Sequence, residues 1–167
     1  MEFTGSRGHP ALTDAQTGLP NALHWDTVFG TVFAAGDRGI PLTLILLEVD
    51  HFLEWAGEKS SEEVDGTFRA LGLALSSTTR QSDLVARLDE TRFAYMLLDC
   101  NLAGGRLVTD RLDGLLDPVR DLSGLGFCMG VASYQKDMVR PDQLVAAAET
   151  ALKSGQALGT NQIEFYP

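Results

Sequence analysis

The sequence predicts an α+β fold, an α/β sandwich in which helices surround a central sheet of about five strands. Three observations lead to this prediction. Residues 42–49 are almost entirely apolar, as expected of a strand buried on both faces. Residues 84–98 read as two short apolar strands around a polar turn. Between these segments and after them, apolar residues recur at helical spacing, so helices should cover the sheet.

The N-terminal region divides into a tail and a first helix. Residues 1–11 are polar and lack periodicity, so we expect a disordered tail, partly of the kind that cloning sites leave behind. Turn-forming residues follow, and Pro20 can sit at the start of a helix. The next apolar residues fall on one helical face: Trp25, Val28, Phe29, Val32 and Phe33. The chain of 167 residues suits a single domain, which we place at 12–167.

The apolar segment 42–50 should form the central strand. We expect Glu48 and Asp50, near its C-terminal end, to point to opposite faces and therefore not to act as a paired acid and base. For Asp50 we expect a hydrogen bond at the end of the strand. Carboxylates at such a strand end are candidates for exposed chemistry.

A connection and a second helix follow the central strand. Residues 52–59 read as the connection. Ser60 or Ser61 can then cap a helix, because a hydroxyl oxygen accepts a hydrogen bond from a free backbone N–H of the first turn. The buried stripe of this helix is Val64, Phe68, Leu71 and Leu75.

The hairpin is the stretch around which the chain is organised. Its strands should span 84–88 and 93–98, with the polar turn at 89–91 between them. Arg87 should brace the sheet through its long side chain.

The remaining elements complete the sandwich. Asn101 should cap a third helix that Pro118 ends, because proline cannot donate the helical hydrogen bond. A strand at 126–134, a helix beginning at Pro141 and a last short strand at 162–166 follow.

Composition excludes several function classes. The net charge of −10 disfavours nonspecific binding to nucleic acid or to anionic membrane surfaces. The longest apolar run is too short to cross a bilayer, and no secretory signal is visible. We therefore expect a cytoplasmic protein with no membrane insertion by this segment. Cys100 and Cys128 lack metal-ligand spacing and should be reduced packing residues.

Five segments, in order, carry a family resemblance across residues 12–167. They are Asp14–Asn21 (D-x-L-T-G-L-P-N in the family), Glu48–Phe52 (D-I-D-x-F), Ser82–Arg87 (S-D-L-V-A-R), Cys128–Ala132 (S-I-G-V-A) and Ala151–Asn161 (A-L-Y-x-A-K-x-x-G-R-N). Together they resemble the GGDEF family of diguanylate cyclases. The resemblance implies a sheet like that of the nucleotidyl cyclases and a role in cyclic di-GMP signalling.

The signature motif of that family falls on residues 89–93, where only the phenylalanine matches. Asp89 and Glu90 stand where two glycines of the family let the backbone approach nucleotide phosphates. Thr91 stands at the position of a metal-binding carboxylate, and Glu48 replaces the aspartate that is the partner ligand. Since an isolated carboxylate holds Mg²⁺ loosely, the resemblance implies a site without a metal or other cofactor.

The other nucleotide-binding positions of the family are also altered. The guanine-reading asparagine falls on Ala56, and the phosphate-binding lysine and arginine fall on Gln156 and Thr160, whereas one aspartate survives as Asp65. Phosphoryl transfer depends on cations that stabilise the spreading negative charge. We therefore expect a degenerate domain that is not an enzyme.

The product-inhibition site of the family, an R-x-x-D motif, matches Arg80 and Asp83. By resemblance, these residues would bind cyclic di-GMP, with Arg111 as the candidate second arginine and Arg106 less favoured. The alternative is that Arg80 is a solvated residue near the end of a helix, where a cation is favourable without a ligand.

Two functions follow from these expectations. The first is a cyclic di-GMP receptor whose bound state alters contacts with an attached domain or another signalling protein. The second is a ligand-independent scaffold for protein interaction or for a homodimer. Binding of GTP without turnover is a weaker third alternative, because the matching asparagine, lysine and arginine are missing.

Overall fold

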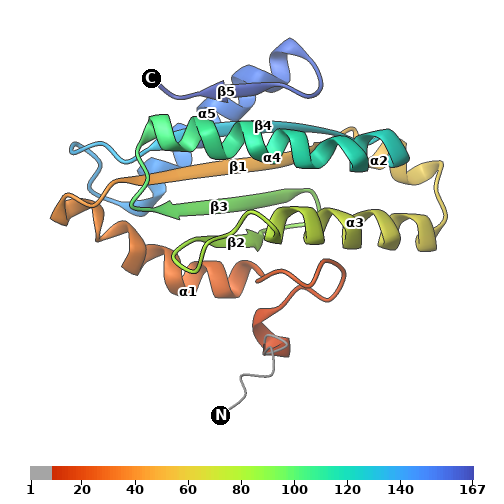
Figure 1. Cartoon of the computed structure of the whole chain (residues 1–167), viewed down its shortest axis with the longest axis horizontal. Helices are drawn as coiled ribbons and strands as arrows, with labels where there is room; N and C mark the ends of the chain where they lie inside the picture. The colour runs from red at the N-terminus through yellow and green to blue at the C-terminus, as the bar shows by residue number, and fades with distance from the viewer. Residues whose placement is uncertain (1–8) are drawn as a thin grey trace.

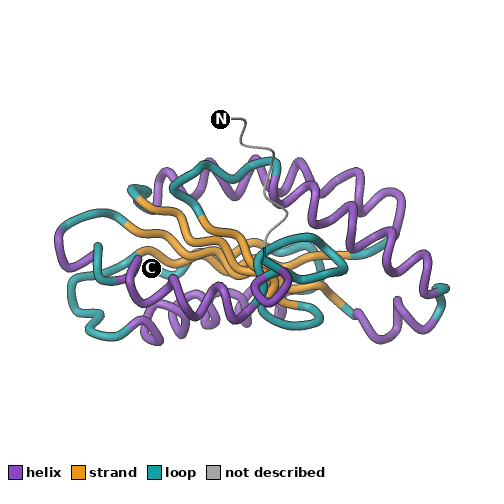
Figure 2. The backbone as a smooth tube through the Cα atoms, turned by 90° about the horizontal axis from the view of Figure 1, so that it is seen from below, coloured by secondary structure: helices purple, strands orange, loops and turns teal. Residues whose placement is uncertain are grey.

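The computed structural model describes residues 9–167 and forms three layers. One mixed sheet lies between two layers of helices, and Figure 2 shows helices on both of its sides. The predicted α+β class is confirmed, as is the predicted number of strands.

The sheet has the strand order β2-β3-β1-β4-β5 (Figure 1). Its strands are β1 (Leu42–Asp50), β2 (Leu84–Arg87), β3 (Arg92–Leu98), β4 (Gly126–Ser133) and β5 (Ile163–Phe165). The nearly all-apolar β1 lies at the centre, antiparallel to both β3 and β4, while β5 runs parallel to β4. Burial on both faces explains why its side chains are apolar at successive positions rather than at alternate ones.

The helices segregate onto the two faces of the sheet. They are η1 (Pro10–Leu12), α1 (Ala22–Phe33), η2 (Gly36–Arg38), α2 (Phe52–Gly57), α3 (Ser61–Ser76), α4 (Leu102–Ser123) and α5 (Pro141–Leu158). The first core joins one sheet face to α3 and α4, through residues such as Phe68 and Leu112. The second core joins the opposite face to α1 and α5, through Trp25 and Leu144.

Local signals set the helix starts, as predicted at Ser60 and Asn101. Pro20, expected at the start of a helix, instead precedes the cap of α1 and pairs with Thr13 in an isolated β-bridge. Asn21 and Asn101 cap α1 and α4 with their side-chain oxygens. Ser60 caps α3 through a reciprocal capping box, in which its hydroxyl accepts from the backbone N–H of Glu63 and its own backbone N–H donates to the Glu63 carboxylate. Gly130 lets β4 and α5 approach closely, since a Cβ atom there would collide with the helix backbone at Ala148.

Pro118 does not end the third helix, so that prediction was wrong. The helix α4 continues to Ser123 with Pro118 inside it. Pro118 and Gly114 are both exposed, so water can reach the backbone where the helical hydrogen bond is lost. Arg120 also donates to the carbonyl oxygen of Asp113 (3.0 Å), one residue before the Gly114 carbonyl that loses its helical donor.

Three other expectations need correction or comment. The connection after β1 contains the short helix α2. The predicted boundary of the tail at residue 12 falls inside η1, and residues 1–8 of that tail lie outside the described residues. Glu48 and Asp50 lie on the same face of β1, not on opposite faces, because side chains two positions apart in a strand point the same way.

Among residues 9–167, the structure contains no helix long and apolar enough to cross a membrane.

Candidate functional site

The open end of the β2–β3 hairpin begins with a tight turn from Arg80 to Asp83. The backbone N–H of Asp83 donates to the carbonyl oxygen of Arg80 (3.0 Å), and the backbone N–H of Arg80 donates to the Asp83 carboxylate (3.1 Å). The Arg80 guanidinium forms a fork on the same carboxylate, with Nε–Oδ2 at 3.1 Å and Nη2–Oδ1 at 3.2 Å. Such two-point pairs fix the orientation of a guanidinium.

Burial differs sharply between the two partners of this pair. The Asp83 side chain is 3% exposed and the Arg80 side chain is 56% exposed. The hydrogen bond and charge of Asp83 raise the pKa of Arg80 further above its ordinary value. Arg80 also donates from Nη2 to the carbonyl oxygen of Leu98, at the far end of β3 (3.1 Å). A buried anion thus holds an outward-facing cation at the end of the sheet.

Arg111 reaches the same place from α4. Arg80, Asp83 and Arg111 line one pocket of about 470 Å³ between the hairpin end and the start of α4. The other lining residues are Pro41, Thr78, Asp99, Cys100, Asn101, Gly104, Leu107 and Val108. The structure therefore brings together all three predicted site residues. Arg106 does not line this pocket, and its guanidinium lies over the ring of Phe165, 3.9 Å from the centroid.

The pocket can recognise an anion or a group rich in hydrogen-bond acceptors. Two guanidinium groups supply rigid forks of N–H donors, which suit phosphate oxygens and the edges of bases. Asn101 caps α4 at the same pocket, so the positive end of that helix adds to the potential. Asp83 and Asp99 supply the acceptors.

The turn end of the hairpin is organised differently. Glu48 of β1 lies opposite Arg92 of β3 in the sheet register. Arg92 donates from Nε to Glu48 Oε2 (2.8 Å) and from Nη1 to Glu149 of α5 (2.7 Å). Thr91 donates its hydroxyl to the second oxygen, Glu48 Oε1 (3.1 Å). Both oxygens of the Glu48 carboxylate are therefore bonded within the protein.

Arg92 carries a stable charge at this position. Burial lowers the pKa of its guanidinium, but hydrogen bonds and charge interactions with Glu48 and Glu149 outweigh burial, so the pKa lies above its ordinary value.

Glu48, Thr91 and Arg92 do not fit Mg²⁺, which prefers several oxygen ligands around one point. Among the described residues, no cluster of three or more His, Cys, Asp or Glu side chains could hold a metal ion.

Arg87 closes the tip of the turn. It donates to the carbonyl oxygens of Asp89 (3.0 Å) and Glu90 (2.7 Å), and to the side chains of Asp14 (3.2 Å) and Gln16 (2.6 Å). Its guanidinium also lies over the ring of Phe68, 4.6 Å from the centroid. The prediction that Arg87 braces the sheet is confirmed, and its partners tie the N-terminal segment to the hairpin.

Two aspartates at other family positions make hydrogen bonds within the protein. Asp65 accepts a hydrogen bond from Gln16 (2.8 Å). Asp50 accepts from the Thr160 hydroxyl (2.6 Å) and from the backbone N–H of Asn161 (3.1 Å), which confirms its predicted hydrogen bond at the strand end.

Sequence reasoning missed Arg92. It follows Thr91 directly and pairs across the sheet with Glu48, so the residues at the metal position have an arginine as their neighbour. Opposite charges on adjacent antiparallel strands tend to pair, and this rule could have identified Arg92 as the partner of Glu48. To apply it, one must know the register of β1 against β3, which the sequence does not display.

Comparison with known proteins places the chain in a family. A family model described as diguanylate cyclase, GGDEF domain, matches residues 11–162. The uncharacterized protein YhcK of Bacillus subtilis is 25% identical over 160 residues, covering 91% of this chain and 45% of YhcK. The probable diguanylate cyclase DgcC of Escherichia coli K12 is 26% identical over 156 residues, covering 90% of this chain and 42% of DgcC. The chain thus spans less than half the length of these relatives.

Solved structures share the fold. The GGDEF domain of DgcB from Caulobacter crescentus, in complex with c-di-GMP, matches with a TM-score of 0.82 at 18% identity, over 95% of this chain and 97% of that one. Diguanylate cyclase SiaD from Pseudomonas aeruginosa, in complex with its activator SiaC, matches with a TM-score of 0.83 at 22% identity, over 93% and 62%. With the family model matching nearly its whole length, this chain belongs to the GGDEF domain family of cyclic di-GMP signalling.

Proposed function

We propose that this domain binds cyclic di-GMP at Arg80, Asp83 and Arg111 without synthesising it, and that the bound ligand alters contacts with a partner protein. The observation that carries the proposal is the meeting of these three residues in one pocket at the open end of the hairpin. The partner is an attached domain or a separate signalling protein.

Preorganisation supports binding at this pocket. Cyclic di-GMP offers phosphate oxygens and guanine edges, which accept hydrogen bonds from guanidinium forks. Asp83 already fixes the Arg80 guanidinium, so a ligand would lose little affinity to the ordering of that side chain. The Arg80 side chain is also 56% exposed, so a ligand can approach its guanidinium from solvent.

The turn end supports the absence of synthesis. At the position of the family's metal ligands, Glu48 is bonded to a hydroxyl and a guanidinium. At the glycine positions, Asp89 and Glu90 are tied down through their carbonyl oxygens to Arg87. Thr160, at the position of a phosphate-binding arginine, is uncharged and bonded to Asp50. Asp89 and Glu90 thus add negative charge and Thr160 removes a cation where phosphoryl transfer needs cations, and Thr91 removes a carboxylate that would hold the metal.

A ligand at this pocket could be sensed by a partner. Arg80 precedes β2, whereas Arg111 lies on α4. A molecule that bonds to both arginines would join the edge of the sheet to the helix layer. It would also add its own surface to the outside of the domain, which a partner could recognise.

Calorimetric titration with cyclic di-GMP tests the binding step. We expect heat of binding with the unaltered protein and at least about tenfold weaker binding for Arg80→Ala and Arg111→Ala, since a hydrogen bond to a charged group contributes about 1.5–3 kcal/mol. Arg106→Ala is the matched control, because Arg106 lies on the same helix outside the pocket, and it should bind normally.

Two results would contradict the proposal. The first is no heat with the unaltered protein, which would favour the scaffold function. The second is formation of cyclic di-GMP when the protein is incubated with Mg²⁺ and GTP, followed by chromatography. That result would refute the absence of synthesis and leave the binding site standing.

A further inference from the structure

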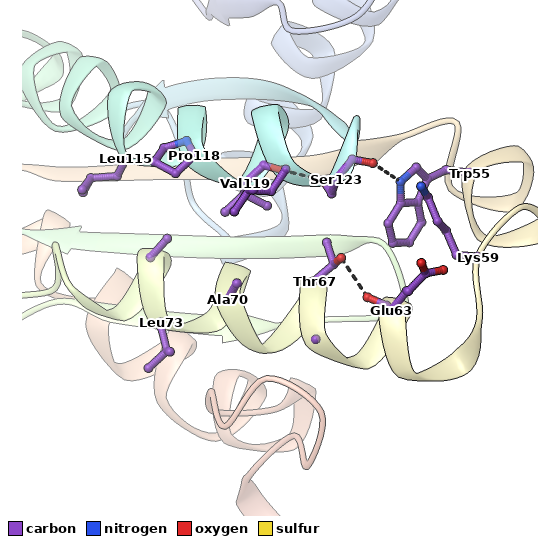
Figure 3. Close-up of a pocket in the computed structure, with 13 residues that line it drawn as sticks. Trp55, Lys59, Glu63, Thr67, Ala70, Leu73, Leu115, Pro118, Val119 and Ser123 are labelled. Carbon is purple, nitrogen blue, oxygen red and sulfur yellow. Dashed lines mark hydrogen bonds between the residues drawn. The ribbon is translucent and has the colours of Figure 1, made fainter.

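A groove runs between α3 and α4 on the side of these helices that faces away from the sheet. Its volume is about 500 Å³. Figure 3 shows one wall formed by α4, with Leu115, Pro118 and Val119, and the other by α3, with Thr67 and Ala70. The α4 wall is apolar, whereas the α3 wall consists mainly of small side chains.

The groove is closed at one end and flanked by exposed leucines. Trp55 lies at the closed end, where its indole N–H donates to the carbonyl oxygen of Ser123 at the end of α4 (2.7 Å; Figure 3). Leu73 on α3 is 67% exposed and Leu122 on α4 is 90% exposed, and both line the groove. Large apolar side chains gathered around a concave surface are typical of a binding surface for another protein.

The dimensions of the groove suit a helix. The α3 wall extends from Glu63 to Ala74, which is about 16 Å along the helix axis. This length matches about three helical turns, enough for apolar side chains at positions i, i+4 and i+7 of a docked helix. Small side chains at Gly66, Ala70 and Ala74 leave space for those side chains to enter.

Charge around the groove identifies the kind of helix. The segments 55–74 and 115–123, which contain the lining residues, carry six acidic and three basic side chains, a net charge of −3. Glu63 lines the groove together with Lys59, and Glu58, Glu62 and Asp121 are exposed acidic residues next to lining residues, whereas Asp117 is paired with Arg120 (2.8 Å). A second copy of this acidic chain would bring like charges together, so an occupant with basic flanks is favoured.

We infer that the α3–α4 groove is a docking site for an amphipathic helix of a partner protein, with its apolar side chains in the groove and its flanking lysines or arginines against the acidic surface. This inference does not depend on cyclic di-GMP binding, because none of the ligand-pocket residues lines the groove.

Trp55 provides a reporter for the test. The chain has two tryptophans, and Trp25 lies in the other core, stacked on Phe29. The Trp25→Phe variant therefore leaves the groove tryptophan as the only indole. The probe is a synthetic helical peptide of about 15 residues, long enough to form a helix, with leucines at i, i+4 and i+7 and lysines on both flanks. A matched peptide carries glutamates in place of the lysines.

We expect the lysine peptide to change the Trp55 fluorescence and to bind at least tenfold more tightly than the glutamate peptide. Ala70→Phe, which fills the groove from an exposed position, should weaken binding at least tenfold. Ala103→Phe, at an exposed position of α4 outside the groove, should leave binding unchanged. Circular dichroism checks that each variant folds.

Three results would overturn the inference. Equal affinity of the two peptides would remove the role of the acidic surface. Unchanged binding by Ala70→Phe would place the peptide elsewhere. A dimer in sedimentation that Ala70→Phe converts to a monomer would make a second copy the occupant.

Discussion

The two ends of the β2–β3 hairpin use arginine in opposite ways. At the turn end, Arg92 has a side chain 25% exposed and bridges two glutamates of the same chain. At the open end, Arg80 is held by one buried carboxylate and remains 56% exposed. The first arginine is satisfied internally, whereas the second keeps a face toward solvent. The charge of an arginine therefore does not identify a binding site, whereas guanidinium N–H groups that are not bonded within the protein do.

This difference separates two properties that occur together in one family. By resemblance, the turn end corresponds to the family's metal and substrate positions, and in this chain its polar groups bond to one another. By the same resemblance, the open end corresponds to the product-inhibition motif, and in this chain its arginines converge on a pocket. If the comparison is correct, substitutions at the turn end should change stability, and substitutions at the open end should change ligand affinity.

The largest loss of stability is expected for Arg87→Met at the turn end. Arg87 is buried and bonds to Asp14, Gln16 and two backbone carbonyl groups. Removal of one partner from such a network should lower the free energy of unfolding by about 3 kcal/mol, measured by urea denaturation. Arg87→Lys should lose most of the same amount, because an ammonium group cannot reproduce the planar fork. A loss below about 0.5 kcal/mol, as for a surface substitution, would refute this role.

A smaller loss is expected for Arg92→Met, which leaves Glu48 and Glu149 without their shared cation. These groups are partly exposed, so the free energy of unfolding should fall by about 2 kcal/mol. In a double-mutant cycle, Glu48→Gln should cost less in the Arg92→Met background than in the unaltered protein. Affinity for cyclic di-GMP should not change. A marked loss of affinity would show that the two ends are coupled and would break the comparison.

Local sequence signals predicted much of the fold. The apolar run of β1, the alternation of apolar and polar segments, and the caps at Ser60 and Asn101 each act within a few residues, so the sequence displays them directly. The end of α4 was mispredicted because the helix tolerates Pro118 where the neighbouring backbone is open to water.

The site was predicted less completely, because it depends on contacts between distant segments. Resemblance to a family motif suggested Arg80, Asp83 and Arg111, and the structure places them in one pocket. Nothing local indicated that Arg92 would meet Glu48, 44 positions earlier, and Glu149. Those contacts follow from the register of β1 against β3 and from the position of α5 over the sheet.

At the open end, Arg80→Met should cost the unliganded protein less than the substitutions at the turn end. The buried Asp83 carboxylate loses the guanidinium but keeps the backbone N–H of residue 80, so the free energy of unfolding should fall by about 1–2 kcal/mol. If cyclic di-GMP binds at the proposed site, it should raise the melting temperature of the unaltered protein and not that of this variant. A large loss of stability without ligand would mean that Arg80 is structural, and the distinction between the two ends would fail.

The smallest effect concerns pH and separates the contribution of Asp14 from that of Arg87. Burial raises the pKa of Asp14, but hydrogen bonds from the Thr17 hydroxyl (2.6 Å) and backbone N–H (2.9 Å), together with Arg87, outweigh burial and lower the pKa below 3.8. A carboxyl group whose pKa is lower in the folded state stabilises the protein above its unfolded pKa, and this stabilisation disappears as the pH falls through the folded pKa. Asp14→Asn should therefore reduce the free energy of unfolding by about 1 kcal/mol at pH 7, and the difference from the unaltered protein should narrow below about pH 4.

Asp26→Asn removes an exposed carboxylate on α1 and serves as the control. If the difference for Asp14→Asn stayed constant from pH 7 to pH 3, the effect would come from shape and not from charge, and the turn end would be held together by packing around Arg87 more than by its ion pair.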